Sequence, residues 1–132
     1  MSRDYTKLRV FDLADDLVLE VYREVLRFPA DEKYGLQSQL RRAAVSVATN
    51  IVEGSVRRSE RSWVHYLETS LGSACEVRYL IGLARRLGIL TEQGAGPLST
   101  RYSELIAGLQ SLISSMPAGQ SLIEGRRQKA EG

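Results

Sequence analysis

Apolar residues recur at steps of three and four along most of the chain, and this is the spacing of amphipathic α-helices rather than of strands. Four segments carry the pattern, at residues 10–28, 35–56, 60–87 and 98–116. Ser59 is suited to cap the third segment, Gly88 to end it, and Pro97 to lie in the first turn of the fourth. Because the intervening loops are short, the pattern predicts an all-α fold, an antiparallel up-and-down four-helix bundle.

A chain of 132 residues has the usual size of one domain. We assign residues 1–116 to the bundle. Residues 117–132 begin with Pro117, contain Gly119 and Gly125, and end in a charged run. This composition predicts a mobile C-terminal tail.

The second segment is apolar over more of its circumference than one core requires. Its apolar residues cover an arc of about 200°, roughly twice what a helix packed on a single core needs. They are Leu36, Leu40, Ala43, Ala44, Val45, Val47, Ala48, Ile51 and Val52. The consecutive Tyr79, Leu80 and Ile81 show the same excess in the third segment. A fully enclosed bundle is one explanation; the other is burial against further copies of the chain, which predicts a homo-oligomer in the form of a ring.

Polar residues border this apolar arc at Ser46, Asn50, Glu53 and Arg57, linked by steps of three and four. In one interpretation the stripe is solvated, and Glu53 and Arg57 form an ordinary i,i+4 ion pair. In the other, Asn50 and Glu53 hydrogen-bond across a helix or subunit boundary, where a polar group without a partner costs ~1–3 kcal/mol. Gly54, which is unfavourable inside a helix, indicates either the close approach of a neighbouring backbone or the end of the helix. We therefore assign Ser46, Asn50, Glu53 and Gly54 a structural or interfacial role.

Positive charge is concentrated in the middle of the chain, although the net charge is only +2. Residues 41–61 contain Arg41, Arg42, Arg57, Arg58 and Arg61 against two acidic residues. Guanidinium groups pair well with phosphate oxygens, so these arginines are the candidate site for RNA or DNA. On a helical projection Arg41, Arg42, Arg57 and Arg58 point in different directions. The alternative is therefore that they are ordinary solvated or ion-paired side chains and bind no nucleic acid. A ring would repeat each arginine group around its axis.

The residues that an enzyme needs are sparse. Cys75 and His65 are the only residues of their types, and the sequence contains no Glu-x-x-His pair and no phosphate-cradling glycine loop. We expect Cys75 to be a buried, inert thiol and His65 to lie at a surface or interface. The sequence therefore predicts a protein with no catalytic residue, no cofactor and no metal site.

Membrane-directing segments are lacking as well. The first seven residues are polar, and no run approaches the ~18 apolar residues of a membrane span. We expect a cytoplasmic protein that has no membrane partner.

An ordered series of short motifs crosses the whole predicted bundle. They are Lys7-Leu8-Arg9-Val10-Phe11, Val21-Tyr22, Phe28-Pro29, Tyr34-Gly35-Leu36, Ser38-Gln39-Leu40-Arg41-Arg42-Ala43, Asn50-Ile51-Val52-Glu53-Gly54 and Leu71-Gly72-Ser73. Over residues 7–116 the chain thereby resembles the four-helix-bundle protein family encoded in intervening sequences of bacterial 23S ribosomal RNA genes. The resemblance implies a homo-oligomer, commonly a pentamer, with no established catalytic activity. A more distant likeness, to the accessory bundle protein of diversity-generating retroelements, implies binding of nucleic acid and of a reverse transcriptase.

Two functions of different kinds are consistent with these features. The first is a non-catalytic oligomer that binds RNA or DNA through its repeated arginines. The second is a protein–protein interaction scaffold or adaptor, in which the arginines provide solubility or electrostatic steering and have no direct nucleic-acid role.

Overall fold

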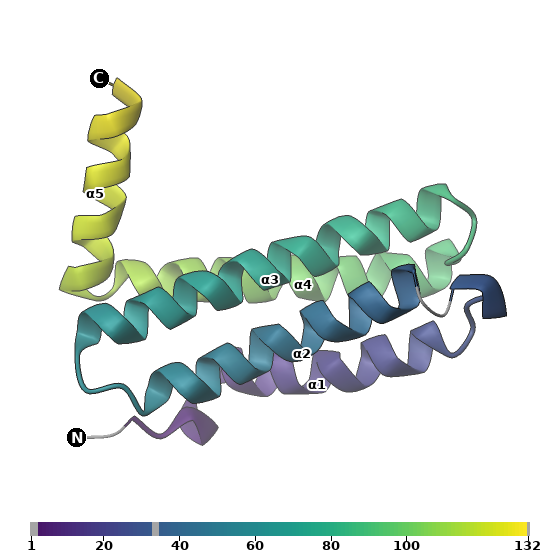
Figure 1. Cartoon of the computed structure of the whole chain (residues 1–132), viewed down its shortest axis with the longest axis horizontal. Helices are drawn as coiled ribbons and strands as arrows, with labels where there is room; N and C mark the ends of the chain where they lie inside the picture. The colour runs from purple at the N-terminus through teal and green to yellow at the C-terminus, as the bar shows by residue number, and fades with distance from the viewer. Residues whose placement is uncertain (1–2, 33–34, 132) are drawn as a thin grey trace.

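The computed structural model describes residues 3–32 and 35–131, and it consists of helices joined by short turns (Figure 1). The elements are η1 (Tyr5–Lys7), α1 (Arg9–Val25), η2 (Ala30–Glu32), α2 (Leu36–Ser55), α3 (Glu60–Arg86), α4 (Glu92–Ser114) and α5 (Pro117–Glu131). These two ranges contain no strand, which confirms the predicted all-α class. None of the helices in the described part of the chain is long and apolar enough to cross a membrane.

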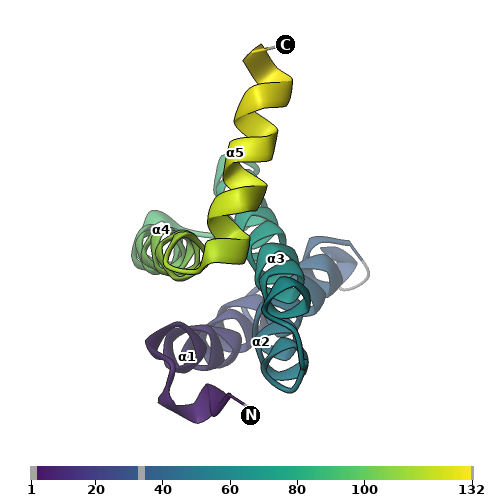
Figure 2. The same ribbon diagram turned by 90° about the vertical axis from the view of Figure 1, so that its left-hand side faces the viewer.

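The four long helices α1 to α4 lie side by side, and successive ones run in opposite directions (Figure 1). Helices α1 and α3 each pack against both α2 and α4, so the four enclose a common interior. That interior is apolar: Leu17, Ile51, Leu67 and Leu105 come from four different helices and are all fully buried. Helix α5 stands away from the other four, crosswise to them, at the end where α3 begins and α4 finishes (Figure 2).

The ends of α3 lie where the sequence places them. Ser59 Oγ accepts a hydrogen bond from the backbone N–H of Ser62 at 3.1 Å, which satisfies one of the free donors at the helix start. Gly88, just beyond the last turn, has a φ of +75°, a left-handed conformation that glycine adopts without steric cost. Both predicted end signals of this helix are confirmed.

Helix α4 begins at Glu92, earlier than the prediction that places Pro97 in its first turn. Thr91 caps it, because its hydroxyl accepts a hydrogen bond from the backbone N–H of Gly94 at 3.3 Å. Pro97 consequently lies inside the helix on an exposed face, and not in its first turn. Gly94 does not delay the helix; it lies beside the Glu24 carboxylate of α1, and an added Cβ 2.6 Å from Glu24 Oε2 would make that side chain move.

Most of the apolar arc of α2 is buried within the single chain, between α1 and α3. Val45, Ala48 and Val52 remain half-buried. In α3, Ile81 is buried whereas Tyr79 is 61% exposed. Packing within one chain therefore accounts for most of the apolar arc of α2. The apolar surface that α2 leaves exposed is narrower than the sequence suggested.

Two further expectations have different outcomes. The segment after Met116, expected to be a mobile tail, forms helix α5; its mobility stays a prediction. Cys75 is exposed, so the expectation of a buried thiol is wrong. The reason is its position: Ala74 faces the interior, and the next residue lies about 100° further round the helix, on the outer side. His65 lies at the surface, as expected.

Candidate nucleic-acid interface

Three of the predicted arginines gather at the turn between α2 and α3. Helix α2 ends at Ser55 and α3 begins at Glu60, so Arg57 and Arg58 lie in the turn and Arg61 in the first turn of α3. All three side chains are exposed. None of the ion pairs formed by residues 3–32 and 35–131 involves them. We call these three residues the turn cluster; their charges are free to meet an anionic partner.

Arg3, near the N-terminus, lies beside the turn cluster. Its backbone N–H donates to the Ser55 carbonyl at 3.2 Å, and its Nη1 donates to the Arg57 carbonyl at 2.8 Å. Its guanidinium lies 5.3 Å from the Trp63 ring centroid, and that of Arg57 lies 4.7 Å from the Tyr66 ring centroid. Such cation–π contacts hold a guanidinium in place while its N–H groups remain able to donate. Sequence reasoning missed Arg3 because no local pattern links it to a turn so far along the chain.

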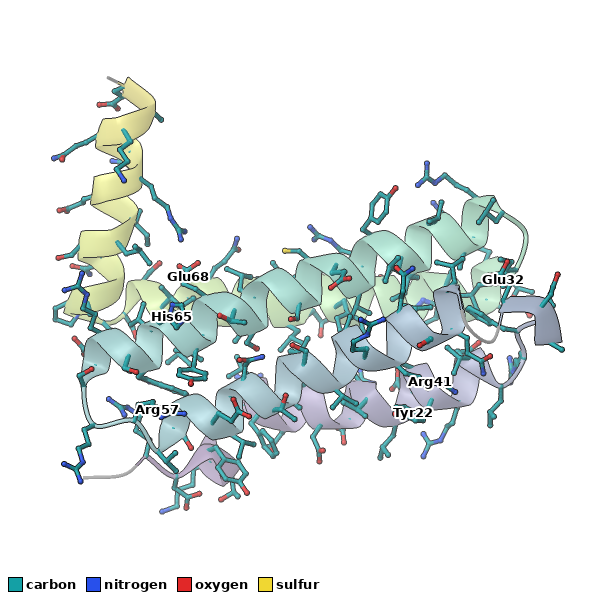
Figure 3. The ribbon with its side chains drawn as sticks, viewed as in Figure 1. Tyr22, Glu32, Arg41, Arg57, His65 and Glu68 are labelled. Atoms are coloured by element: carbon teal, nitrogen blue, oxygen red, sulfur yellow. The ribbon has the colours of Figure 1, made fainter. Side chains whose placement is uncertain are left out.

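Arg41 and Arg42 lie apart from the turn cluster, on the N-terminal half of α2; Figure 3 shows Arg41 and Arg57 far from each other. Counted along the helix, the separation is about 20 Å, at 1.5 Å per residue. Arg41 is half-buried, with its guanidinium 5.9 Å from the Tyr22 ring centroid. Arg42 is exposed and borders a hollow of about 400 Å³ that Glu76 also lines. One subunit thus presents two separate arginine groups.

Ser46 and Asn50 belong to a small hydrogen-bonded group where α2 meets α3. The hydroxyl oxygens of Ser46 and Ser73 lie 2.8 Å apart across the two helices. Asn50 Nδ2 donates to the Ser46 carbonyl at 2.8 Å and to Ser46 Oγ at 3.1 Å. Asn50 is therefore connected to α3 through Ser46. Glu53 is exposed on α2, so in a single subunit its carboxylate lies in solvent.

Gly54 lies where α2 comes very close to α3. It is buried, and an added Cβ would lie 2.6 Å from Tyr66 Cβ and 2.7 Å from Trp63 Cε3. A side chain at this position would have to push the two helices apart. Helix α2 also ends one residue later, at Ser55. Both explanations offered for this glycine therefore apply, except that the close neighbours are side chains rather than backbone.

Exposed apolar side chains form a strip along α1. Leu19, Tyr22 and Leu26 are 53%, 44% and 79% exposed, and steps of three and four place them on one face. We call these residues the α1 strip. The sequence analysis did not identify this strip, because the regularly spaced apolar residues of α1 that form the core lie on the opposite face.

The turn cluster offers binding chemistry. Guanidinium groups present planar N–H donors that match phosphate oxygens in geometry and charge. Within the described ranges, no group of three or more His, Cys, Asp or Glu side chains is placed to hold a metal ion. The arrangement is suited to holding an anionic polymer.

Over the described residues, the fold is all-helical, and a group of exposed arginines that form no ion pair there lies at one end. Residues 6–111 match the 23S rRNA-intervening sequence protein family, and the chain belongs to that family. This confirms the resemblance drawn from the motifs. The chain is also similar to the crystal structure of a protein with unknown function from the S23 ribosomal protein family of Bacteroides thetaiotaomicron. The two share 20% identity and a TM-score of 0.71, over 78% of this chain and 96% of that chain, so this likeness shows the fold alone. A comparison with curated proteins finds no match.

Proposed function

We propose that this chain is a non-catalytic, cytoplasmic four-helix-bundle protein that assembles as a homo-oligomeric ring and binds RNA or DNA through phosphate contacts. The observation that carries the proposal is the turn cluster. Arg57, Arg58 and Arg61 are exposed, adjacent and without an ion-pair partner among the described residues. Surface arginines that only provide solubility are commonly interspersed with acidic partners, whereas a phosphate-binding surface needs unpaired guanidinium groups.

Arg41 and Arg42 provide the second contact in this proposal. They are too far along α2 to share a phosphate with the turn cluster, so they engage another part of the same strand or another face of the ring. Repetition around a ring multiplies modest local charge into an extended positive surface. The protein then binds many sequences with little preference, because phosphate contacts carry no base information.

The α1 strip supports the oligomer. An exposed series of Leu19, Tyr22 and Leu26 on one helix face is the kind of surface that is buried against another subunit. Arg41 packs on the ring of Tyr22, at the margin of this strip. The family resemblance implies five subunits, and a pentamer is the size that we propose.

Binding of a labelled single-stranded RNA of mixed sequence tests the function. The test variant is Arg57→Gln with Arg58→Gln. The control is Arg85→Gln with Arg86→Gln, which removes the same charge from the opposite end of α3. Because hydrogen bonds to charged groups contribute about 1.5–3 kcal/mol each, the test variant should raise Kd by about tenfold or more. The control should leave Kd nearly unchanged.

Light scattering on a sizing column accompanies this measurement. Both variants should keep the mass of the unaltered oligomer, because the altered residues lie outside the α1 strip. Equal loss of affinity in the two variants would show that binding reflects total charge only. No RNA binding at all would favour the protein-scaffold function.

A further inference from the structure

Helix α5 lies beyond the residues that match the family. The match ends at residue 111, before α5 begins at Pro117. The helix is held at a defined angle to α3 and α4 rather than packed along them (Figure 2). The family match therefore carries no expectation about α5, and its role has to be argued from its own contacts.

Two contacts fix α5 against α3, and a third packs it against the end of α4. Glu60 Oε2 accepts a hydrogen bond from the backbone N–H of Ala118 at 3.2 Å. Gly119 is buried against the Ile113 carbonyl, where a side chain would find no room. Further along, Arg126 Nη1 forms an ion pair with Glu68 Oε2 at 3.2 Å. The Glu60 and Arg126 contacts span the angle between α5 and α3.

This arrangement leaves a cleft of about 730 Å³ between α3 and α5. Arg61, Val64 and His65 line it from α3, and Leu122, Gly125 and Lys129 line it from α5. In Figure 3, His65 and Glu68 lie on α3 near the base of α5. The volume falls in the range of ~300–1,000 Å³ typical of small-ligand sites.

The lining combines cations with an apolar surface. Glu68, the carboxylate among the lining residues, is already paired with Arg126. The ion pairs of the described chain leave Arg61 and Lys129 uncommitted. Leu122 supplies apolar surface beside the buried Val64, and the exposed His65 ring supplies an aromatic one. Cations beside apolar and aromatic surface suit a nucleotide, which is charged at its phosphates and flat and weakly polar on its base faces.

We infer that the cleft between α3 and α5 takes one nucleotide of a single-stranded RNA. Its base lies over His65 and against Leu122, while the flanking phosphates meet Arg61 and Lys129. The inference rests on the proposed function and deepens it, because Arg61 belongs to both the turn cluster and the cleft. A strand bound along the turn cluster thereby continues into the cleft.

Gly125 permits a test of the cleft that changes no charge. An added Cβ there meets no atom within 4 Å, so Gly125→Leu is compatible with the helix while its side chain fills the cleft. Gly82→Leu is the matched control, because Gly82 is also helical with no atom near an added Cβ and lies toward the far end of α3. Both variants are first checked for unchanged helicity and oligomer mass.

Gly125→Leu should raise the Kd for single-stranded RNA by about fivefold or more, as expected when one base is deprived of its stacking surface. Its salt dependence should stay that of the unaltered protein, and Gly82→Leu should bind normally. The double variant Arg61→Gln with Lys129→Gln should instead flatten the dependence of log Kd on log salt concentration, by about 0.7 for each phosphate that the protein no longer binds.

Two results would overturn the inference in distinguishable ways. If Gly125→Leu binds RNA with unaltered affinity while Arg57→Gln with Arg58→Gln weakens binding, the cleft is wrong and the proposed function stands. If the unaltered protein binds neither single-stranded RNA nor DNA at about 50 mM salt, where phosphate contacts are strong, both fail.

Discussion

The carboxylate of Glu60 accepts a hydrogen bond from the backbone N–H of Ala118, with 3.2 Å between Oε2 and N. This contact joins the first turn of α3 to the first turn of α5, although the two residues are far apart in sequence. The start of α3 thereby positions both Arg61 and the helix that faces it across the cleft.

Glu60→Ala should loosen α5 without unfolding the other helices. The first-turn N–H groups of α5 lose an acceptor, and the hydrogen bond contributes about 1.5 kcal/mol, equivalent to about tenfold faster local opening. Hydrogen exchange should accelerate in residues 118–131 and stay unchanged around Leu67. Glu104→Ala, an exposed carboxylate on α4, is the control. Equal exchange of α5 in both variants would show that the carboxylate does not hold the helix.

Gly54→Ala should destabilise the protein by about 1–3 kcal/mol, because the new methyl group would overlap Tyr66 and Trp63. Gly72→Ala is the matched control, since an added Cβ there meets no atom within 4 Å. That change should raise the free energy of unfolding by up to about 1 kcal/mol through helix propensity. Chemical denaturation measures both, and effects of the same sign would contradict the close approach of α2 and α3.

Asn50→Leu should lower the free energy of unfolding by about 1 kcal/mol, because the Ser46 carbonyl and hydroxyl lose the amide that donates to them. Far-UV circular dichroism should show unchanged helicity. Gln39→Leu removes an exposed side-chain amide from the same helix and serves as the control. If the two substitutions are equally harmless, the Ser46–Asn50 group adds nothing to stability.

Tyr102→Phe should leave stability at pH 7 unchanged or raise it. The Tyr102 hydroxyl is buried in the interior and has no hydrogen-bond partner among the described residues. Its desolvation therefore lowers the free energy of unfolding, and no hydrogen bond offsets that loss. Burial also raises the pKa of Tyr102 above its ordinary value of 10.0. The unfolded chain therefore releases the proton first, and the free energy of unfolding falls as pH rises above about 10.

The loss of stability above pH 10 should consequently be smaller in Tyr102→Phe than in the unaltered protein. Identical pH profiles for the two proteins would mean that water reaches Tyr102 in the folded state.

The helices were predictable from sequence wherever local chemistry determines them. Ser59 caps α3 and Gly88 ends it because their effects act within one helical turn. The start of α4 was not predictable in the same way: Gly94 and Pro97 weaken a helix locally, but Thr91 caps α4, and Ala95 and Leu98 are buried in its first two turns. Helix α5 was not predicted, because its glycines are unfavourable in a helix. The Glu60 carboxylate that accepts a hydrogen bond from its first turn lies far away in the sequence.

The candidate site was predictable only in part. Arg57, Arg58 and Arg61 are close in sequence, so their grouping follows from the short turn that contains them. The separation of Arg41 from the turn cluster follows from their spacing along α2. The positions of Arg3 and Lys129 depend instead on how distant parts of the chain pack, and hydrophobic periodicity does not encode that packing.

The salt dependence of RNA binding tests the central claim most directly. Log Kd, measured across salt concentrations for a single-stranded RNA, should change linearly with log salt concentration, because bound phosphates release counterions. Arg57→Gln with Arg58→Gln should reduce the slope by about 0.7 for each phosphate that is no longer bound, while Arg85→Gln with Arg86→Gln leaves it unchanged. A slope that is the same in all three proteins would contradict a phosphate-binding role for the turn cluster.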